Sequence, residues 1–442
     1  MCRTKYSKVL LALVLLCSSV CLSAQSGAYT GYTPYSIYGI GEIYKNGSAY
    51  NKSMGGVGVA TRNRKYINYL NPASVTARDS LSFMADASYS FNTIIYQNGD
   101  AVSAHNIYTI NDFAISFPIY RSSAVIFGIT PYSSTGYAFS SYDDDYNKIA
   151  DTGGRIKSSV AGQGGLYELF AGGAVIFWKK LSLGAEWLYY FGNTSKESAI
   201  IFSNSTYNGL TTGYSLNLSG STAKLGVQYE QPLGKYTLGA GATYKFKTKL
   251  NGYVGEYSLT TGTVTDTLAY KVDTLGYKGT PSLSLASEIA VGISLRYREK
   301  WRVEFDYTYA DWRNAGFDNV KGYSTYSAST AFSTTIAESY RLGFEYTPNI
   351  NDIRYYRKRC TYRAGLFRES EYFALDGAKV YSTGLSLGVT LPVFKGSNGL
   401  TFTAELGQTG NLSVPNLTRQ RFVNFCFGFN AYDLWFMKHQ YR

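Results

Sequence analysis

The chain has 442 residues, of which 45% are hydrophobic and 16% aromatic, with 43 tyrosines, 45 glycines and a formal net charge of +12. This aromatic and glycine content departs from that of an ordinary soluble domain. Its basic residues are spread along the sequence and form no Lys/Arg stripe of the kind that a nucleic-acid groove needs, so we exclude nucleic acid as a partner.

The N-terminus has the order of a secretory signal peptide. Three basic residues precede the apolar run VLLALVLLCSSVCL, and the small residues Ser23 and Ala24 follow it. We therefore predict a signal peptide over residues 1–24. Its removal takes three positive charges away and leaves +9 on the mature chain. It also leaves only Cys360 and Cys426, too few for a disulfide framework.

From about residue 80 onward, apolar and polar residues alternate with period two, as in strands. Trp301 and Phe305 lie on one face of such a segment, and Glu304 and Asp306 lie on the other. Each segment is long enough to cross a membrane as a tilted strand of roughly 9 to 11 residues. The predicted strands cover 81–91, 109–119, 123–132, 165–177, 181–192, 214–230, 236–250, 283–297, 301–312, 334–347, 355–368, 380–392, 400–409 and 420–431.

The connections and the aromatic residues indicate a membrane barrel. Short turns alternate with the long polar loops 133–162, 193–212 and 258–281, and the apolar faces repeatedly end in Tyr or Trp. In outer-membrane barrels, short turns face the periplasm, long loops face the exterior, and aromatic girdles mark the interfaces. We predict an all-β fold, a transmembrane antiparallel barrel of about fourteen strands over residues 80–442. The residues expected to face lipid are Val291, Ile293, Trp301, Phe305, Tyr307 and Leu342.

Residues 25–79 do not alternate and hold the Gly- and Tyr-rich runs YSIYGIGE and SMGGVGVA. Such a segment cannot be a lipid-facing strand. We predict that it forms an N-terminal plug inside the barrel, because Gly-rich runs allow close backbone packing and luminal charges can satisfy its polar groups.

The order of a Gly-rich stretch, then Asn71-Pro72-Ala73, then a first strand with a long barrel behind it resembles the FadL/TodX family of outer-membrane transporters for hydrophobic compounds. The segments SYRLGFEYTPN, YRAGLF, LSLGVTLP and ELGQTGN resemble the Bacteroidetes branch of that family. The resemblance implies a 14-strand barrel in the outer membrane of a Gram-negative bacterium. It also implies a hatch that blocks the lumen and a strand irregularity through which an apolar solute leaves sideways into the membrane.

Two prolines mark a candidate for that irregularity. Pro118 and Pro131 lie inside the second and third predicted strands, where proline removes a ladder hydrogen bond. With Gly128 they form our candidate lateral gate. The alternative is that each proline merely ends its strand early. Loop 133–162 is almost wholly polar, which argues against fatty acid as the cargo.

A set of charged residues on three successive predicted strands is expected to face the lumen. These charges can form a salt-bridge network that anchors the plug, or a polar track for the head group of a solute. The set comprises Arg302, Glu304, Asp306, Arg341, Glu345, Arg357, Arg359 and Arg363.

We predict no enzymatic activity, no cofactor and no metal site. The mature chain holds two histidines, His105 and His439, and neither belongs to a recognisable triad. The expected function is passage of small hydrophobic or amphipathic compounds across the outer membrane. The alternative is a non-transporting accessory barrel of an outer-membrane secretion or assembly complex. The expected partners are accordingly outer-membrane lipid, a hydrophobic small molecule or an outer-membrane protein complex.

Overall fold

The structure is a computed structural model. It describes residues 32–79, 81–120, 122–143, 149, 154–204, 206–261, 267–277, 280–320, 331–393, 399–412 and 417–434. The predicted signal peptide and His439 lie outside these residues. Among the helices of the described part, none is both long enough and apolar enough to cross a membrane.

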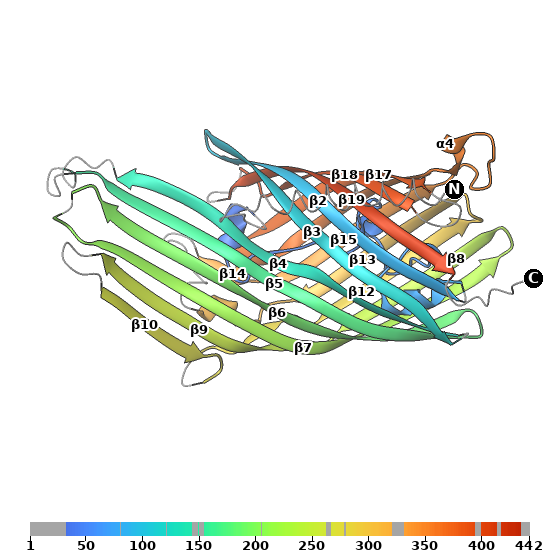
Figure 1. Cartoon of the computed structure of the whole chain (residues 1–442), viewed down its shortest axis with the longest axis horizontal. Helices are drawn as coiled ribbons and strands as arrows, with labels where there is room; N and C mark the ends of the chain where they lie inside the picture. The colour runs from blue at the N-terminus through green and yellow to red at the C-terminus, as the bar shows by residue number, and fades with distance from the viewer. Residues whose placement is uncertain are drawn as a thin grey trace, which may run out of the picture.

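The described strands form one closed antiparallel barrel (Figure 1). Its wall has fourteen positions, which we call staves, and some staves consist of two or three successive strands. The chain closes on itself because the last strand pairs with the first along its whole length, from Arg419 opposite Gln97 to Leu434 opposite Ser82. The staves are β2 (Ser82–Asn98), β3 (Ala101–Tyr120), β4 (Ser123–Asp143), β5 (Ile156–Phe177), β6 (Leu181–Phe202), β7 (Gly209–Leu233), β8 (Tyr236–Lys245) with β9 (Thr248–Thr261), β10 (Thr267–Thr274) with β11 (Leu283–Leu285) and β12 (Glu288–Tyr297), β13 (Trp301–Asp311), β14 (Phe332–Thr334) with β15 (Ile336–Tyr346), β16 (Thr361–Leu375), β17 (Ala378–Pro392), β18 (Gly399–Thr409) and β19 (Arg419–Leu434).

The predicted fourteen-strand barrel is confirmed, but its strands are longer than predicted. Much of the predicted polar loops 133–162, 193–212 and 258–281 belongs to β4 through β10, which extend to one side beyond the other staves (Figure 1). Beyond the membrane both faces of a strand meet water, so the period-two signal disappears while the hydrogen-bond ladder continues.

The alternation places apolar side chains on the outer face. Val291, Ile293 and Leu342 are 45%, 60% and 44% exposed, which on a barrel stave means that they point outward. Trp301 and Tyr307 are less exposed because their rings pack on neighbouring rings. Trp301 packs on Tyr297, and Tyr307 packs on Tyr340.

One predicted strand begins too early. Residues 355–360 were expected to start the eleventh strand, but Tyr356–Arg359 form the short helix α4, and β16 starts at Thr361. Asp352 causes the turn, because its carboxylate accepts hydrogen bonds from the backbone N–H groups of Arg354 and Tyr355 at 3.0 and 2.6 Å.

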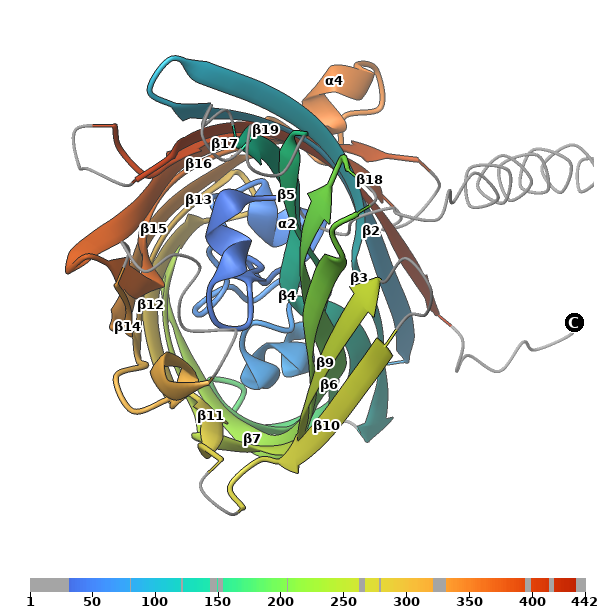
Figure 2. The ribbon, with the colours of Figure 1, turned by 90° about the vertical axis from the view of Figure 1, so that its left-hand side faces the viewer.

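The described part of the predicted plug, residues 32–79, lies inside the barrel (Figure 2). It contains η1 (Pro34–Ile37), β1 (Glu42–Ile43), α2 (Ala49–Lys52) and η2 (Pro72–Ala77). Each of these two 3-10 helices has proline at its first position and a capping side chain just before it, Thr33 in η1 and Asn71 in η2. Proline suits the first position of a helix because its φ is already helical and its missing N–H would have no partner there. A further 3-10 helix, η3 (Phe317–Asn319), lies between β13 and β14.

Candidate functional site

Two carboxylates of β13 hold the backbone of the plug. Asp306 Oδ2 accepts hydrogen bonds from the N–H groups of Gly58 and Val59 at 2.7 and 2.9 Å, and Glu304 Oε1 accepts one from Ala60 N at 3.1 Å. Both carboxylates are almost fully buried. Period two puts them on the same luminal face, so one stave binds three consecutive plug residues.

Two arginines of the predicted luminal set also bind the plug. Arg302 donates to Tyr50 Oη at 3.1 Å and to the carbonyl of Arg62 at 3.0 Å. Arg341 donates to the carbonyl of Gly56 at 3.1 Å. The barrel wall therefore supplies acceptors to plug N–H groups and donors to plug carbonyls, which satisfies buried backbone that has no ladder of its own.

The remaining predicted charges divide into two groups. Arg363 forms a 2.8 Å ion pair with Glu345 on the neighbouring stave. Arg357 and Arg359 are not on a strand, since both lie in α4, and Arg357 is exposed. The structure thus brings six of the eight predicted charges together on the inner wall and places two at the rim.

The motif Asn71-Pro72-Ala73 is the point where the end of the plug meets β6 and β7. Asn71 Oδ1 accepts from Ala73 N at 3.0 Å and starts η2. Its Nδ2 donates to the carbonyls of Val59 and Val227, at 2.8 and 3.2 Å. This one amide therefore ties two plug segments to the wall.

Wall glycines let the plug touch the strands directly. A Cβ on Gly365 would lie 2.1 Å from Gly55 N, and a Cβ on Gly241 would lie 2.1 Å from the carbonyl oxygen of Val59. Such distances are far inside van der Waals contact. The plug backbone therefore occupies the space that side chains would fill at these two positions.

Lys45 is a plug residue that the sequence patterns did not indicate. Its ammonium lies 3.2 Å from Glu369 and 3.1 Å from Glu405, and 3.6 Å from the centre of the Phe367 ring. Both glutamates take inward positions of their strands, so their period-two register could have suggested luminal charges. The plug has no such register, and nothing in its sequence distinguished Lys45.

A cavity of about 180 Å³ lies next to the plug, lined in part by Lys45, Glu288, Arg341, Glu369 and Glu371. Sites for small organic ligands are usually about 300–1,000 Å³ and mostly apolar. This cavity is smaller and strongly charged, which does not suit a hydrophobic solute.

The wall itself is incomplete between β3 and β4. Their pairing runs from Tyr120 opposite Ser123 to Phe113 opposite Ile129 and stops there, although both strands continue. A side-chain bond from Thr130 Oγ1 to the carbonyl of Asn111, at 2.8 Å, marks the point of separation. Beyond it, β3 pairs with β2 and β4 pairs with β5, so within the described residues a gap separates the two strands.

The plug fills this gap from inside. Strand β1 pairs with the free edge of β4, Glu42 opposite Ser134 and Ile43 opposite Ser133. The N–H of Tyr44 adds a 2.9 Å bond to the carbonyl of a β4 residue, Tyr132. The edge of β4 that β3 leaves unpaired is therefore capped by the plug.

Tyr32 reaches across the gap. Its ring stacks on His105 of β3 with 3.7 Å between ring centres, and its hydroxyl donates to the carbonyl of Ala138 on β4 at 2.5 Å. Thr33 N donates to the carbonyl of Gly136 at 2.9 Å. One end of the plug thus contacts both edges of the opening.

The candidate gate residues do not all border this gap. Pro131 lies just beyond the last pair of β3 and β4, beside a register shift toward β5. Pro118 pairs with Ala124 beside a register shift next to the short turn, and Gly128 pairs with Ala114 in an uninterrupted part of the ladder. Both prolines therefore lie at ladder irregularities, but the two strands separate only near Pro131, since the pairing continues past Pro118. The lateral gate itself stays a prediction.

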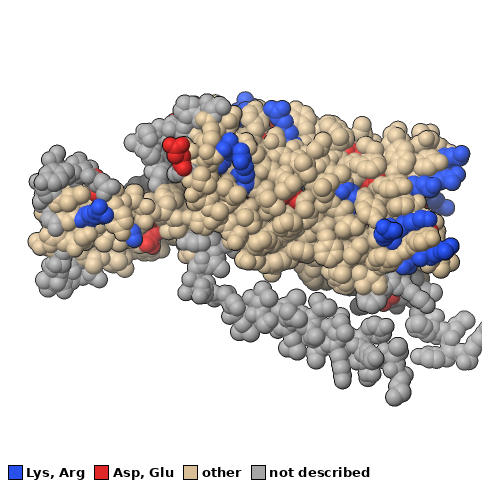
Figure 3. All heavy atoms as spheres, turned by 90° about the horizontal axis from the view of Figure 1, so that it is seen from above, with Lys and Arg blue, Asp and Glu red and all other residues tan. Residues whose placement is uncertain are grey.

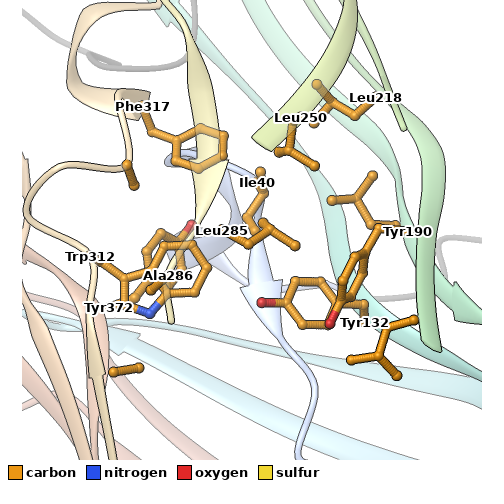
Figure 4. Close-up of a cluster of buried hydrophobic side chains, with 14 of the residues drawn as sticks. Ile40, Tyr132, Tyr190, Leu218, Leu250, Leu285, Ala286, Trp312, Phe317 and Tyr372 are labelled. Carbon is orange, nitrogen blue, oxygen red and sulfur yellow. The ribbon is translucent and has the colours of Figure 1, made fainter. Parts of the chain in front are cut away.

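Apolar side chains close the lumen on the exterior side of the plug. Figure 4 shows Ile40 of the plug among Tyr132, Tyr190, Leu285 and Tyr372, which come from four different strands. All five residues are buried and belong to one cluster. The lumen is therefore filled by packed side chains at this level.

The fold resembles solved outer-membrane channels. The Pseudomonas putida toluene transporter TodX matches with a TM-score of 0.53 at 14% identity, over 90% of this chain and 99% of that one. The Ralstonia pickettii toluene transporter TbuX gives 0.53 at 14%, over 87% and 97%. A Pseudomonas aeruginosa FadL homologue gives 0.51 at 13%, over 92% and 99%.

At these identities the similarity shows the fold alone, an outer-membrane barrel like FadL and TodX. The search of curated proteins found no match. The sequence model of the family described as BamG matches residues 6–442, nearly the whole chain. The chain therefore belongs to the BamG family.

Proposed function

We propose that this chain is an accessory barrel of an outer-membrane assembly machine, the β-barrel assembly (BAM) complex to which the family description points, rather than a channel. The observation that carries the proposal is the direct packing of the plug on the barrel wall. A channel for a solute needs a path, and the plug backbone lies directly against the wall at Gly241 and Gly365.

The plug bonds also argue against easy displacement. The two N–H bonds that Asp306 accepts are charge-assisted, and each such bond contributes about 1.5 to 3 kcal/mol; Glu304 accepts a third. Removing the plug would break all three of these bonds. A barrel whose interior is fixed in this way offers a partner its outer surface and its two rims.

Co-purification tests the proposal. A tagged copy of the chain, expressed at its native level and extracted in mild detergent, should retain the central barrel of the assembly machine in fixed stoichiometry. A second outer-membrane barrel with the same tag serves as the control and should not retain it. Recovery of the tagged chain without any assembly component, under conditions that keep the machine intact, refutes the proposal.

The gap between β3 and β4 favours a second candidate, lateral passage of a hydrophobic compound. Its test is uptake of a labelled hydrophobic probe by cells that carry a deletion of residues 25–44, compared with wild type at equal surface abundance. The transport hypothesis expects faster uptake, because the segment that caps the free edge of β4 is gone. Equal rates would eliminate this candidate.

A further inference from the structure

One end of the barrel is strongly basic. Figure 3 shows Lys and Arg side chains gathered at the end of the molecule that carries the short turns. In outer-membrane barrels this end faces the periplasm. The exposed basic residues of the short turns include Lys179, Lys180, Lys235, Arg298, Lys300, Arg354, Arg357 and Lys358.

A cavity of about 500 Å³ opens within this end of the barrel. Its walls are the plug residues 63–66, the turn between β12 and β13, and the turn between β15 and β16. Eight basic and three acidic side chains line it, so its charge is positive. The basic ones are Arg64, Lys65, Arg296, Arg298, Lys300, Arg302, Arg359 and Arg363, and the acidic ones are Asp79, Glu299 and Glu345.

Arg363 is one of the basic residues that line this cavity. Its side chain is fully buried, with Nε 2.8 Å from Glu345, Nη1 2.6 Å from Thr390 Oγ1 and the guanidinium 4.3 Å from the centre of the Tyr50 ring. Among the described residues, Nη2 has no hydrogen-bond partner. Leaving a buried N–H of a charged group unpaired is energetically unfavourable. The guanidinium adds positive charge to the cavity wall while the side chain itself stays enclosed.

The turn beside the cavity adds an apolar contact. Ile353 is 99% exposed, and Tyr355 and Tyr356 are about half exposed at 46% and 44%. Ile350 and Asn351 of the same turn line the cavity. An apolar side chain held fully in water next to a basic cavity fits a polypeptide ligand that has both carboxylates and an apolar residue.

We propose that this basic mouth, the cavity together with the turn 347–360, docks an acidic peptide segment of a periplasmic partner protein. The inference rests on the proposed accessory role and names the chemistry of the partner. A peptide can enter along the barrel axis. A phospholipid would have to bend its head group over the ring of turns while its chains stay in the membrane, which the position of the cavity inside the barrel disfavours.

Binding of a fluorescent hexaglutamate peptide to the purified full chain in detergent tests the proposal. The variant R298E/K300E reverses two charges that line the cavity, and K179E/K180E reverses two on another short turn at the same end that do not. We expect salt-dependent binding to wild type, a loss of about tenfold or more in R298E/K300E, and about twofold or less in K179E/K180E. Heat-modifiable migration on gels confirms that both variants are folded.

Three results would overturn the proposal. They are the absence of peptide binding to wild type, an equal loss in both variants, and displacement of the peptide by inorganic phosphate or by phosphatidylglycerol nanodiscs at lower concentration than by unlabelled peptide. The last result would assign the cavity to a phosphate group.

Co-purification in cells separates this inference from the proposed function. If wild type retains the assembly machine, R298E/K300E should retain less of it than K179E/K180E. Equal retention refutes the acidic-peptide site and leaves the accessory role intact. If wild type does not retain the machine, the accessory role fails, and the peptide-binding result alone decides whether the mouth recognises acidic segments.

Discussion

The substitution D306A should release the plug. Asp306 is 2% exposed and accepts two hydrogen bonds, from Gly58 N at 2.7 Å and Val59 N at 2.9 Å. Two charge-assisted bonds of about 1.5–3 kcal/mol each amount to about 3–6 kcal/mol of docking free energy. Because about 1.4 kcal/mol corresponds to a tenfold change, the population with a displaced plug should rise by about a hundredfold or more.

Planar-bilayer recording measures this population as the frequency of open events, and trypsin cleavage at Arg62 and Arg64 reports exposure of the plug. The matched control is D273A, which removes a carboxylate from an exposed ion pair with Lys271 on β10 and should change nothing. If D306A and D273A both behave like wild type, the carboxylates of β13 do not hold the plug and our argument for a closed lumen fails.

Three further predictions test other parts of the structure. G41V should detach β1 from β4, because Gly41 has φ +89 and a Cβ there would lie 2.2 Å from the carbonyl oxygen of Ser134. Amide hydrogen exchange of residues 132–136 should then accelerate, and unchanged exchange would contradict the pairing. I293R should cost roughly 2–4 kcal/mol of unfolding free energy in lipid, whereas I353R at the periplasmic turn should cost nothing, and equal costs would contradict our assignment of the lipid face. Burial, opposed by Lys45 and reinforced by Glu369, raises the pKa of the plug residue Glu42 from 4.5 to about 7. The docked plug should therefore lose stability as pH rises from about 4.5 to 7 and change little above that. The frequency of open events should follow this profile in wild type but not in E42Q. Glu371 is a second carboxyl that faces the same site.

The strands were predictable because the membrane imposes a pattern on them. Lipid on one side and a polar lumen on the other force alternation, so Glu304 and Asp306 could be assigned to the inner face from sequence alone. The pattern ends where the membrane ends. Residues 133–143 of β4 therefore read as loop, although they continue the ladder with β5.

The site was only partly predictable because its contacts join distant segments. Period two identifies Arg302 and Arg341 as luminal but says nothing about the plug carbonyls that they bind, at Arg62 and Gly56. Pro131 correctly indicated an irregular strand. No local signal indicated that the ladder between β3 and β4 ends at Phe113.

The capped gap explains why the first residues of the plug can be Tyr-rich and still have a defined place. An unpaired strand edge in a barrel wall would pair with any available chain, including another copy or a barrel that is being assembled nearby. Residues 42–44 prevent this by occupying the edge of β4 at residues 132–134, and Tyr32 holds the opening from both sides. In this chain the plug therefore serves the wall as much as the lumen, and loss of residues 32–44 should expose a strand edge even where residues 54–73 keep the lumen closed.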